Sequence, residues 1–227
     1  MGEPQEPARQ RWRLVLARAA GAPALAGRDM TEAWELALAA TELPLYRPAG
    51  RSRARLSLGA PLPIGMAAER ELGDIVLTDV LSVWRVREAL SGRLPVGWEL
   101  VDLFDVWLGS PALAGRVTGA EYRVVVEGAA DVGAMAGGAA SLLEERQLPR
   151  ARLKGGVSVA YDLRPLLVDA RVVAPGPPVV LRIRTRIHQE LGTGRPEEVV
   201  AALSDRLGCA IAIASITRER LMLADDD

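Results

Sequence analysis

Arginines at alternate positions are the residues of this chain that are best placed to do chemistry. Two such series occur: Arg51, Arg53 and Arg55, and then Arg182, Arg184 and Arg186. Side chains alternate between the two faces of a β-strand, so each series places its guanidiniums on one face. A guanidinium binds phosphate or carboxylate in bidentate fashion. Such a face suits a phosphate-bearing ligand such as RNA, although a solvated face paired with nearby Glu and Asp has the same pattern.

A corner and a group of acids follow the first series. The prolines and glycine predict a rigid turn, and the carboxylates lead out of it: Pro61, Pro63 and Gly65, then Glu69, Glu71 and Asp74. Two carboxylates two positions apart can share a site as acid and base, or hold Mg²⁺ together with waters. They also serve as partners for nearby arginines, and the spacing leaves these alternatives open.

Two further groups are candidates for phosphate chemistry. Lys154, Tyr161 and His188 are the residue types of a metal-independent ribonuclease, in which His transfers protons and Lys stabilises phosphate charge. Gly192-Thr-Gly194-Arg195 precedes an expected helix and resembles an anion-binding nest, because helix N-terminal N–H groups point outwards there. It lacks the Gly-Lys-Ser/Thr of a P-loop, so nucleotide hydrolysis is not indicated.

Composition excludes several classes of site. The 227 residues contain one cysteine and one histidine, which rules out an internal disulfide, a zinc site or a Cys-ligated iron–sulfur cluster built from this chain alone. Cys209 sits in an apolar run and is predicted to be a core residue. The net charge of −1 argues against a generally basic surface. No segment has the roughly 18–20 apolar residues of a membrane span, and the N-terminus lacks the features of a signal peptide, so we expect a cytoplasmic protein with no membrane partner.

Periodicity and turn signals predict an α+β fold. The first half reads as a strand at 12–16, a helix from Asp29 to about 43, strands at 53–58 and 72–77, a helix capped by Asp79 or Ser82, and a strand at 99–108. The second half reads as a strand at 122–126, a helix at 131–147, extended segments at 151–153, 157–161, 166–173 and 179–187, a helix from Pro196 to Gly208 and a strand at 210–216.

This order predicts two tandem ferredoxin-like (βαββαβ) halves, antiparallel sheets each backed by helices. The expected halves are residues 10–109 and 116–223, and residues 1–9 and 224–227 are expected to be loose tails. Residues 109–115, rich in small residues and proline, are the expected linker. In each half the arginine series should lie on the sheet face that the helices leave open.

The chain resembles the radical SAM-linked (radical SAM-associated) proteins, a bacterial domain of unknown function. Leu43-Pro44-Leu45-Tyr46, Pro61-Leu62-Pro63-Ile64-Gly65, Asp162-Leu163-Arg164-Pro165-Leu166 and Gly194-Arg195-Pro196-Glu197 carry the resemblance, with Glu71 and Asp74. The chain departs from the family where Ala26-Gly27-Arg28-Asp29 replaces Ser-His-Leu-Asp and Gly50-Arg51-Ser52-Arg53 replaces Gly-Phe-Asn-Pro.

The resemblance implies an accessory role. Such domains occur fused to, or encoded beside, a radical SAM protein, which would hold the iron–sulfur cluster and S-adenosylmethionine that this chain does not bind. We therefore expect a non-catalytic module that recognises RNA or a protein substrate for a radical SAM enzyme. Asp162, Arg164 and Arg195 join the arginine series, Glu71 and Asp74 as candidate binding residues. An endoribonuclease or RNA-modifying enzyme and a protein-only scaffold are the alternatives.

Overall fold

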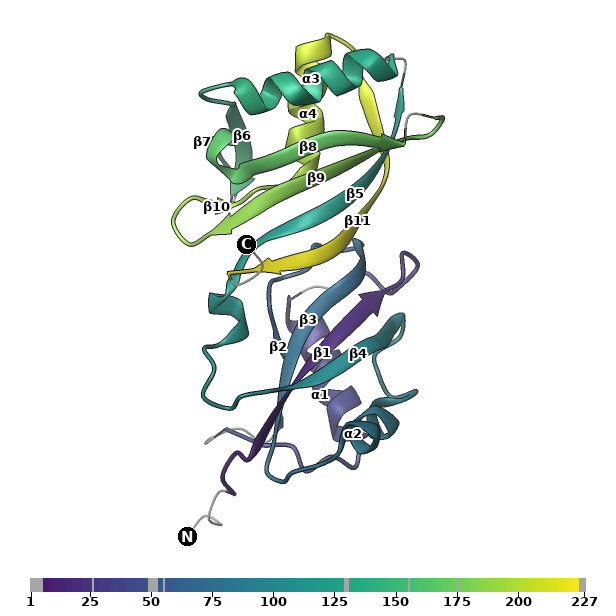
Figure 1. Cartoon of the computed structure of the whole chain (residues 1–227), viewed down its shortest axis with the longest axis vertical. Helices are drawn as coiled ribbons and strands as arrows, with labels where there is room; N and C mark the ends of the chain where they lie inside the picture. Colours follow the sequence, from purple (N-terminus) through teal and green to yellow (C-terminus); the bar gives the residue numbers. More distant parts are fainter. Residues whose placement is uncertain are drawn as a thin grey trace. The chain divides into compact units, whose positions relative to one another are not determined.

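The computed structural model describes residues 6–25, 27–48, 53–54, 56–128, 131–154, 156–174 and 176–224. The chain divides into two compact units, with the boundary between Val117 and Thr118. Within the described residues each unit is a mixed α/β structure with two α-helices and a mostly antiparallel sheet (Figure 1).

The first unit contains two α-helices and four strands in the described residues. In chain order they are β1 (Gln10–Arg18), α1 (Gly27–Ala39), β2 (Ser57–Leu58), β3 (Ala67–Leu77), α2 (Val83–Leu90) and β4 (Trp98–Val106), followed by a 3₁₀ turn, η1 (Leu113–Gly115). The strands lie in the order β2-β3-β1-β4, and every neighbouring pair is antiparallel. The strand predicted at 12–16 is confirmed as part of β1.

Both helices pack on one face of this sheet. Alternate residues of β1 meet residues of α1, β3 and α2 in a core that includes Trp12, Leu14, Leu16, Trp34, Leu38, Ile75, Leu77, Val86 and Leu90. The rings of Trp34 and Trp98 meet edge to face with centroids 5.2 Å apart, an arrangement that aromatic quadrupoles favour. The period of two along β1 and the helical spacing of α2 therefore place their apolar residues in the same layer.

The opposite face of β1 holds a buried ionic cluster. Arg13 lies across from Asp74 of β3 in the strand register, and Arg11 is two residues before it on the same face. Asp74 accepts from Arg11 at 2.5 Å and from Arg13 at 2.9 Å, and all three side chains are at most 10% exposed. Arg11 also donates to the carbonyl oxygens of Ser110 and Pro111, at 2.7 and 3.1 Å. The segment before η1 thus supplies acceptors for a guanidinium that has lost its water.

The strand predicted at 53–58 is much shorter in the structure. Only Ser57 and Leu58 pair with β3, whose far end instead bonds to the segment around Pro44: the Tyr46 amide donates to Val76 and the Thr78 amide to Pro44, each at 2.8 Å. Two separate segments therefore share the edge of β3. Arg53 precedes β2 and lies outside any strand, while Arg51 and Arg55 lie outside the described residues.

The start of α1, the capping of α2 and the burial of Cys209 also differ from the prediction. Asp29 lies in the first turn of α1 rather than before it, since the helix begins at Gly27. Ser82 occupies the N-cap position of α2 but its side chain makes no capping bond. Cys209 was predicted in the core, yet it is only half-buried in the short connection after α4 (Pro196–Leu207), where the left-handed Gly208 turns the chain.

The second unit repeats this strand order with an added hairpin. It contains β5 (Val117–Gly128), α3 (Val132–Glu144), β6 (Pro149–Lys154), β7 (Val157–Asp162), a 3₁₀ turn η2 (Arg164–Leu166), β8 (Leu167–Ala174), β9 (Val179–His188), β10 (Gly192–Thr193), α4 and β11 (Ile211–Leu223). The main sheet runs β8-β9-β5-β11, with β10 joined to the end of β9. β6 and β7 form a separate two-stranded sheet.

A glycine sets how closely α3 and α4 approach. A Cβ placed on Gly138 would lie 2.7 Å from a methyl carbon of Leu203 and 3.2 Å from one of Leu207, both on α4. The glycines of α3 weaken it as an isolated helix. Gly138 compensates by admitting Leu203 of α4 into the space that a side chain would fill.

Asp74→Asn should destabilise the first unit by about 3 kcal/mol, because two desolvated guanidiniums would lose the one carboxylate that they pair with among the described residues. Chemical denaturation measures the change. Asp102→Asn is the matched control, because Asp102 pairs with Arg87 at the surface at 3.1 Å, a contact worth about 1 kcal/mol at most. Equal losses in the two variants would contradict a central role for the Asp74 cluster.

Candidate functional site

An arginine-rich face on the sheet of the second unit is the candidate site. Its members come from four strands and are named together as the arginine face: Arg123, Arg171, Arg182, Arg184, Arg186 and Arg220, with Glu121, Asp169 and Glu219. The helices cover the other face, where Leu181 and Ile183 of β9 are buried. The alternation of β9 thus separates apolar residues from arginines between the two faces, as predicted for this series.

Strand register brings the charged residues into rows. Arg182 lies opposite Arg123 on β5 and opposite Arg171 on β8, so three arginines stand side by side across three strands. In the next row Arg184 lies between Glu121 and Asp169. Only the β9 residues of these rows were singled out from sequence. The other strands carry the patterns Glu121-x-Arg123 and Asp169-x-Arg171. These patterns indicate a shared charged face only when the strand register is known.

Two buried carboxylates hold most of these guanidiniums in place. Arg184 donates to Glu121, which lies 3.7 Å from Arg182 and 3.8 Å from Arg220. Glu219 accepts from Arg182 at 3.1 Å and from Arg123 at 3.4 Å. The Glu121 and Glu219 side chains are 8% and 13% exposed, whereas those of Arg123, Arg182 and Arg184 are 31–41% exposed. The carboxylates form the floor of the face and the arginines reach the solvent.

The arginine face can bind anions but has no group suited to proton transfer. Guanidiniums stay protonated at any physiological pH, and each of the three carboxylates of the face is already paired with an arginine. Six arginines stand against three carboxylates, so the face has excess positive charge even after its internal pairs are counted. Arg186 is exposed and makes no ion pair within the part of the chain that the structure describes.

The acids near the first corner do not form an open site. Asp74 is enclosed by Arg11 and Arg13, and Glu71, also on β3, is 1% exposed. Arg53 lies 3.9 Å from Glu35 of α1. Pro61, Pro63 and Gly65 lie in the β2–β3 connection, where the Met66 amide donates to the Pro63 carbonyl and Gly65 has φ +76°, the value this turn requires.

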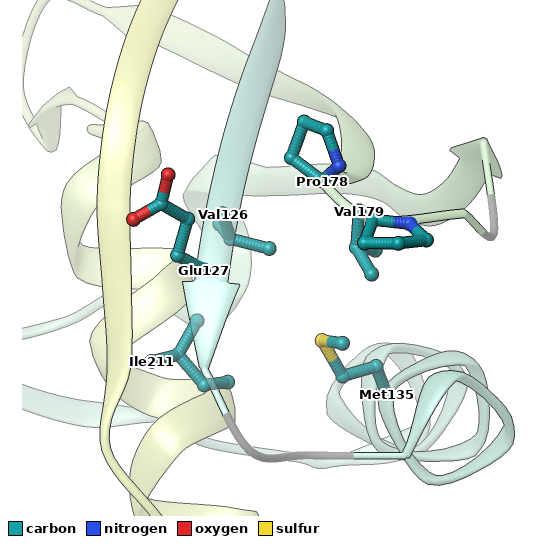
Figure 2. A pocket seen from close by; sticks show the side chains of 7 residues that line it. Val126, Glu127, Met135, Pro178, Val179 and Ile211 are labelled. Atoms are coloured by element: carbon teal, nitrogen blue, oxygen red, sulfur yellow. The ribbon is translucent and has the colours of Figure 1, made fainter.

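An apolar cavity of about 180 Å³ opens in the second unit between α3 and the ends of three strands. Val126, Val179, Ile211, Met135 and Pro178 point into it, while the carboxylate of Glu127 points away from these apolar side chains (Figure 2). The side chains that point inwards offer no hydrogen-bonding group to a ligand. The cavity is therefore suited to an apolar group and not to catalysis.

Residues 11–202 match the model of a family described as an uncharacterized protein conserved in bacteria (DUF2344). The chain belongs to this family. No curated protein matches the chain.

The family match includes most of the arginine face. The arginines of β5, β8 and β9 lie within the matched residues, whereas Glu219 and Arg220 of β11 follow them. No helix in the described part of this family member is long and apolar enough to cross a membrane. The same residues contain no group of three or more His, Cys, Asp or Glu side chains arranged to hold a metal ion.

Asp162 and Arg164, within the matched segment, have partners inside the protein. The Asp162 carboxylate accepts from the Leu148 amide at 2.7 Å and from the Arg164 amide at 2.9 Å, which ties the end of β7 to the start of β6. The Arg164 guanidinium donates to the carbonyls of Leu143 at 2.6 Å and Glu145 at 3.1 Å, at the C-terminal end of α3. It also donates to the Leu167 carbonyl at 2.9 Å. These contacts satisfy helix-end carbonyls that would otherwise lack donors.

The remaining predicted residues lie around the β6–β7 hairpin and the start of α4. Arg195 is the exposed N-cap residue of α4, and Tyr161 lies on β7. The exposed His188 accepts from the Glu190 and Leu191 amides at 3.2 Å, and no hydrogen bond joins it to Tyr161 in the described residues. The side chain of Lys154 lies outside the description, so the proposed grouping of these three stays a prediction.

Arg164→Ala should destabilise the second unit by about 2 kcal/mol, since three carbonyl oxygens would lose a charged donor. Thermal or chemical unfolding measures the loss. Arg146→Ala removes an exposed arginine from the connection after α3 and should change stability by less than about 0.5 kcal/mol. A fully stable Arg164→Ala protein would instead favour a binding role for this arginine.

Proposed function

We propose that this protein is a non-catalytic module that recognises RNA through the arginine face and works with a radical SAM enzyme. The row formed by Arg123, Arg182 and Arg171 is the observation that carries the proposal. The excess of arginine makes the face locally positive, although the net charge of the whole chain is only −1.

Three like charges in one row cost folding free energy. Directly opposed like charges on neighbouring strands destabilise a sheet, and Glu219 relieves only part of this repulsion through Arg123 and Arg182. Arg171 is 3.5 Å from Asp169, its neighbour but one on the same strand. A polyanion laid across the row would supply the missing negative charge and would release the counterions condensed along its backbone.

The arginine face supports recognition of the phosphate backbone rather than of bases. The aromatic residue nearest to the row in sequence is Tyr122, which is 2% exposed and lies on the buried side of β5. RNA-binding sheets that read bases use aromatic side chains for stacking. The described residues of the arginine face include no aromatic side chain, so selectivity would arise from RNA shape and phosphate spacing.

The chemistry of the face supports an accessory role. Its residues are suited to hold an anion and include no acid, base or nucleophile that is free to react, so we assign the reaction to a partner. With only Cys209, the chain has too few thiolates for an iron–sulfur cluster, and both the cluster and S-adenosylmethionine would belong to the radical SAM partner. We expect the pair to act in the cytoplasm.

We also propose that each unit is a ferredoxin-like half. The orders β2-β3-β1-β4 and β8-β9-β5-β11, each with two helices on one face, are what two ferredoxin-like halves at residues 10–109 and 116–223 would have. The β6–β7 hairpin is then an insertion in the second half. In such a half the open sheet face is the surface available to a ligand, which is where the arginine face lies.

Replacing Arg123, Arg171 and Arg186 together with Gln should weaken RNA binding at least tenfold. Arg182 and Arg184 are kept because they neutralise the buried Glu121. Fluorescence anisotropy with single-stranded and duplex RNA over a range of salt concentrations measures the effect. If each arginine contacts one phosphate, the slope of log affinity against log salt should fall by about 2 for single strands.

A matched control removes the same charge elsewhere. Arg9, Arg87 and Arg206 are each ion-paired outside the arginine face, and replacing them with Gln should leave the affinity within about twofold, as weak surface pairs allow. Equal losses in both triple variants, or no RNA binding by the unaltered protein, would overturn the RNA proposal. Cleavage of the RNA by the purified protein, lost on His188→Ala, would favour the endoribonuclease alternative.

A radical SAM enzyme should co-purify with the tagged protein from its own cells, and the complex should survive ribonuclease treatment. Mass spectrometry identifies the partner, and iron analysis of the purified complex checks for its cluster. The arginine-face variant should retain this partner if the face serves RNA alone. Recovery of RNA without any radical SAM enzyme would contradict the partnership, and recovery of the enzyme without RNA would favour a protein-only scaffold.

A further inference from the structure

The β6–β7 hairpin holds a cluster of charged residues that is separate from the arginine face. Arg150 lies opposite Tyr161 in the hairpin register, and Arg152 is two residues further along, so the three side chains share one face. This face is turned towards β10 and α4, since Arg150 pairs with Asp205 of α4 at 2.6 Å and the Arg152 guanidinium lies beside Gly192 of β10.

Arg152 is held in place from two sides. Its guanidinium carbon lies 5.0 Å from the centre of the Tyr161 ring, within the range of a cation–π contact. On another side, a Cβ placed on Gly192 would lie 3.2 Å from Nη2 of Arg152. The absence of a side chain at Gly192 therefore makes space for the guanidinium. Gly192 has φ +89°, which also suits glycine. The guanidinium is thus positioned before any ligand arrives.

Arg152 of the hairpin and Arg195 at the start of α4 have no carboxylate partner among the described residues. Asp205 neutralises Arg150, but neither Arg152 nor Arg195 makes an ion pair with any residue that the structure describes. Arg195 is the N-cap residue of α4, and its side chain makes no capping bond. Both guanidiniums can therefore offer their donor edges to an incoming anion without first breaking an internal pair.

Tyr161 remains a donor at neutral pH. Burial raises the pKa of the Tyr161 phenol, the nearby Glu198 carboxylate raises it further, and the positive charges of Arg152, Arg195 and Arg150 act in the opposite direction. The neutral phenol is the form that can donate a hydrogen bond. Three guanidiniums and one carboxylate are therefore close enough to this hydroxyl to act on its pKa.

We propose that Arg152, Arg195 and Tyr161 form a binding site for a phosphate group. Their donors come from β6, from the start of α4 and from β7, and a guanidinium can bind phosphate oxygens in bidentate fashion. The positive end of the α4 dipole adds to the attraction at Arg195. The negative charge of Glu198 repels a bound anion and so lowers the affinity of the site.

This site goes beyond the proposed function, because it requires neither RNA on the arginine face nor a radical SAM partner. The two sources of such a phosphate that an experiment can compare are the end of a nucleotide chain and its backbone. Both supply the same oxygens to Arg152 and Arg195. The two sources differ only in whether a free phosphate end is needed.

Inorganic phosphate added to the full chain should shift the ¹H–¹⁵N resonances of Gly192 and of the Arg152 and Arg195 side chains, with a saturable dependence on concentration. Arg152→Gln and Arg195→Gln should each weaken this binding at least fivefold, and Tyr161→Phe should weaken it two- to threefold. Glu198→Gln should tighten it severalfold. Arg206→Gln, at the other end of α4, should leave it unchanged.

A trinucleotide with a 5′-phosphate and the same molecule with a 5′-hydroxyl distinguish the two sources. Preference for the phosphorylated form, lost on Arg152→Gln, identifies a terminal phosphate, whereas equal binding of both, lost in the same variant, identifies a backbone phosphate. Variant spectra that keep the wild-type pattern elsewhere confirm that the fold is intact. Absence of saturable phosphate binding, or equal binding by wild type, Arg152→Gln and Arg195→Gln, would overturn the site.

The arginine-face variant separates this proposal from the RNA proposal. Replacement of Arg123, Arg171 and Arg186 should leave phosphate binding at Arg152 unchanged, whatever it does to RNA. Loss of phosphate binding in that variant, with the resonances of Arg152 and Gly192 unperturbed by phosphate, would place the anion on the arginine face and contradict the separate site.

Discussion

The α-helices of each unit cover one face of its sheet, and charged residues on the other face must then find partners from neighbouring strands. In the first unit Arg11 and Arg13 share Asp74, and carbonyls of the segment before η1 complete the shell. In the second unit Glu121 and Glu219 lie beneath the arginines of β5, β9 and β11. One constraint therefore produces both ionic clusters.

The two clusters differ in how much water they retain, and this difference separates structure from function. Arg13 and Asp74 are almost fully enclosed and pair with each other, so neither charge is accessible to a ligand. The arginines that pair with Glu121 and Glu219 are 31–46% exposed, and they outnumber those two carboxylates. A guanidinium that is fixed at its base and exposed at its edge can still bind a ligand.

Prediction from the sequence succeeded where the signal is local. The alternation of residues 179–187 identified β9 and the side of its arginines, and Pro196 with Gly208 bracketed α4. It failed where one segment competes with another for the same edge: the arginines around Arg53 alternate like a strand, but the segment around Pro44 takes part of the edge of β3 and leaves β2 two residues long. Arg164 is a candidate from the family resemblance, and no local pattern shows that its guanidinium donates to a carbonyl of α3.

The sequence by itself determined the period of each strand, the ends of the best-marked helices and the absence of a thiolate cluster, because these depend on neighbours along the chain. Tertiary structure alone decided that Arg123 and Arg171 flank Arg182, that Asp74 is enclosed and that Arg152 rests on Tyr161 beside Gly192. These contacts follow from strand register and helix packing between residues far apart in sequence. A shift of one residue in register would turn every arginine of β9 to the buried side, and no local pattern fixes which partners a correct register brings together.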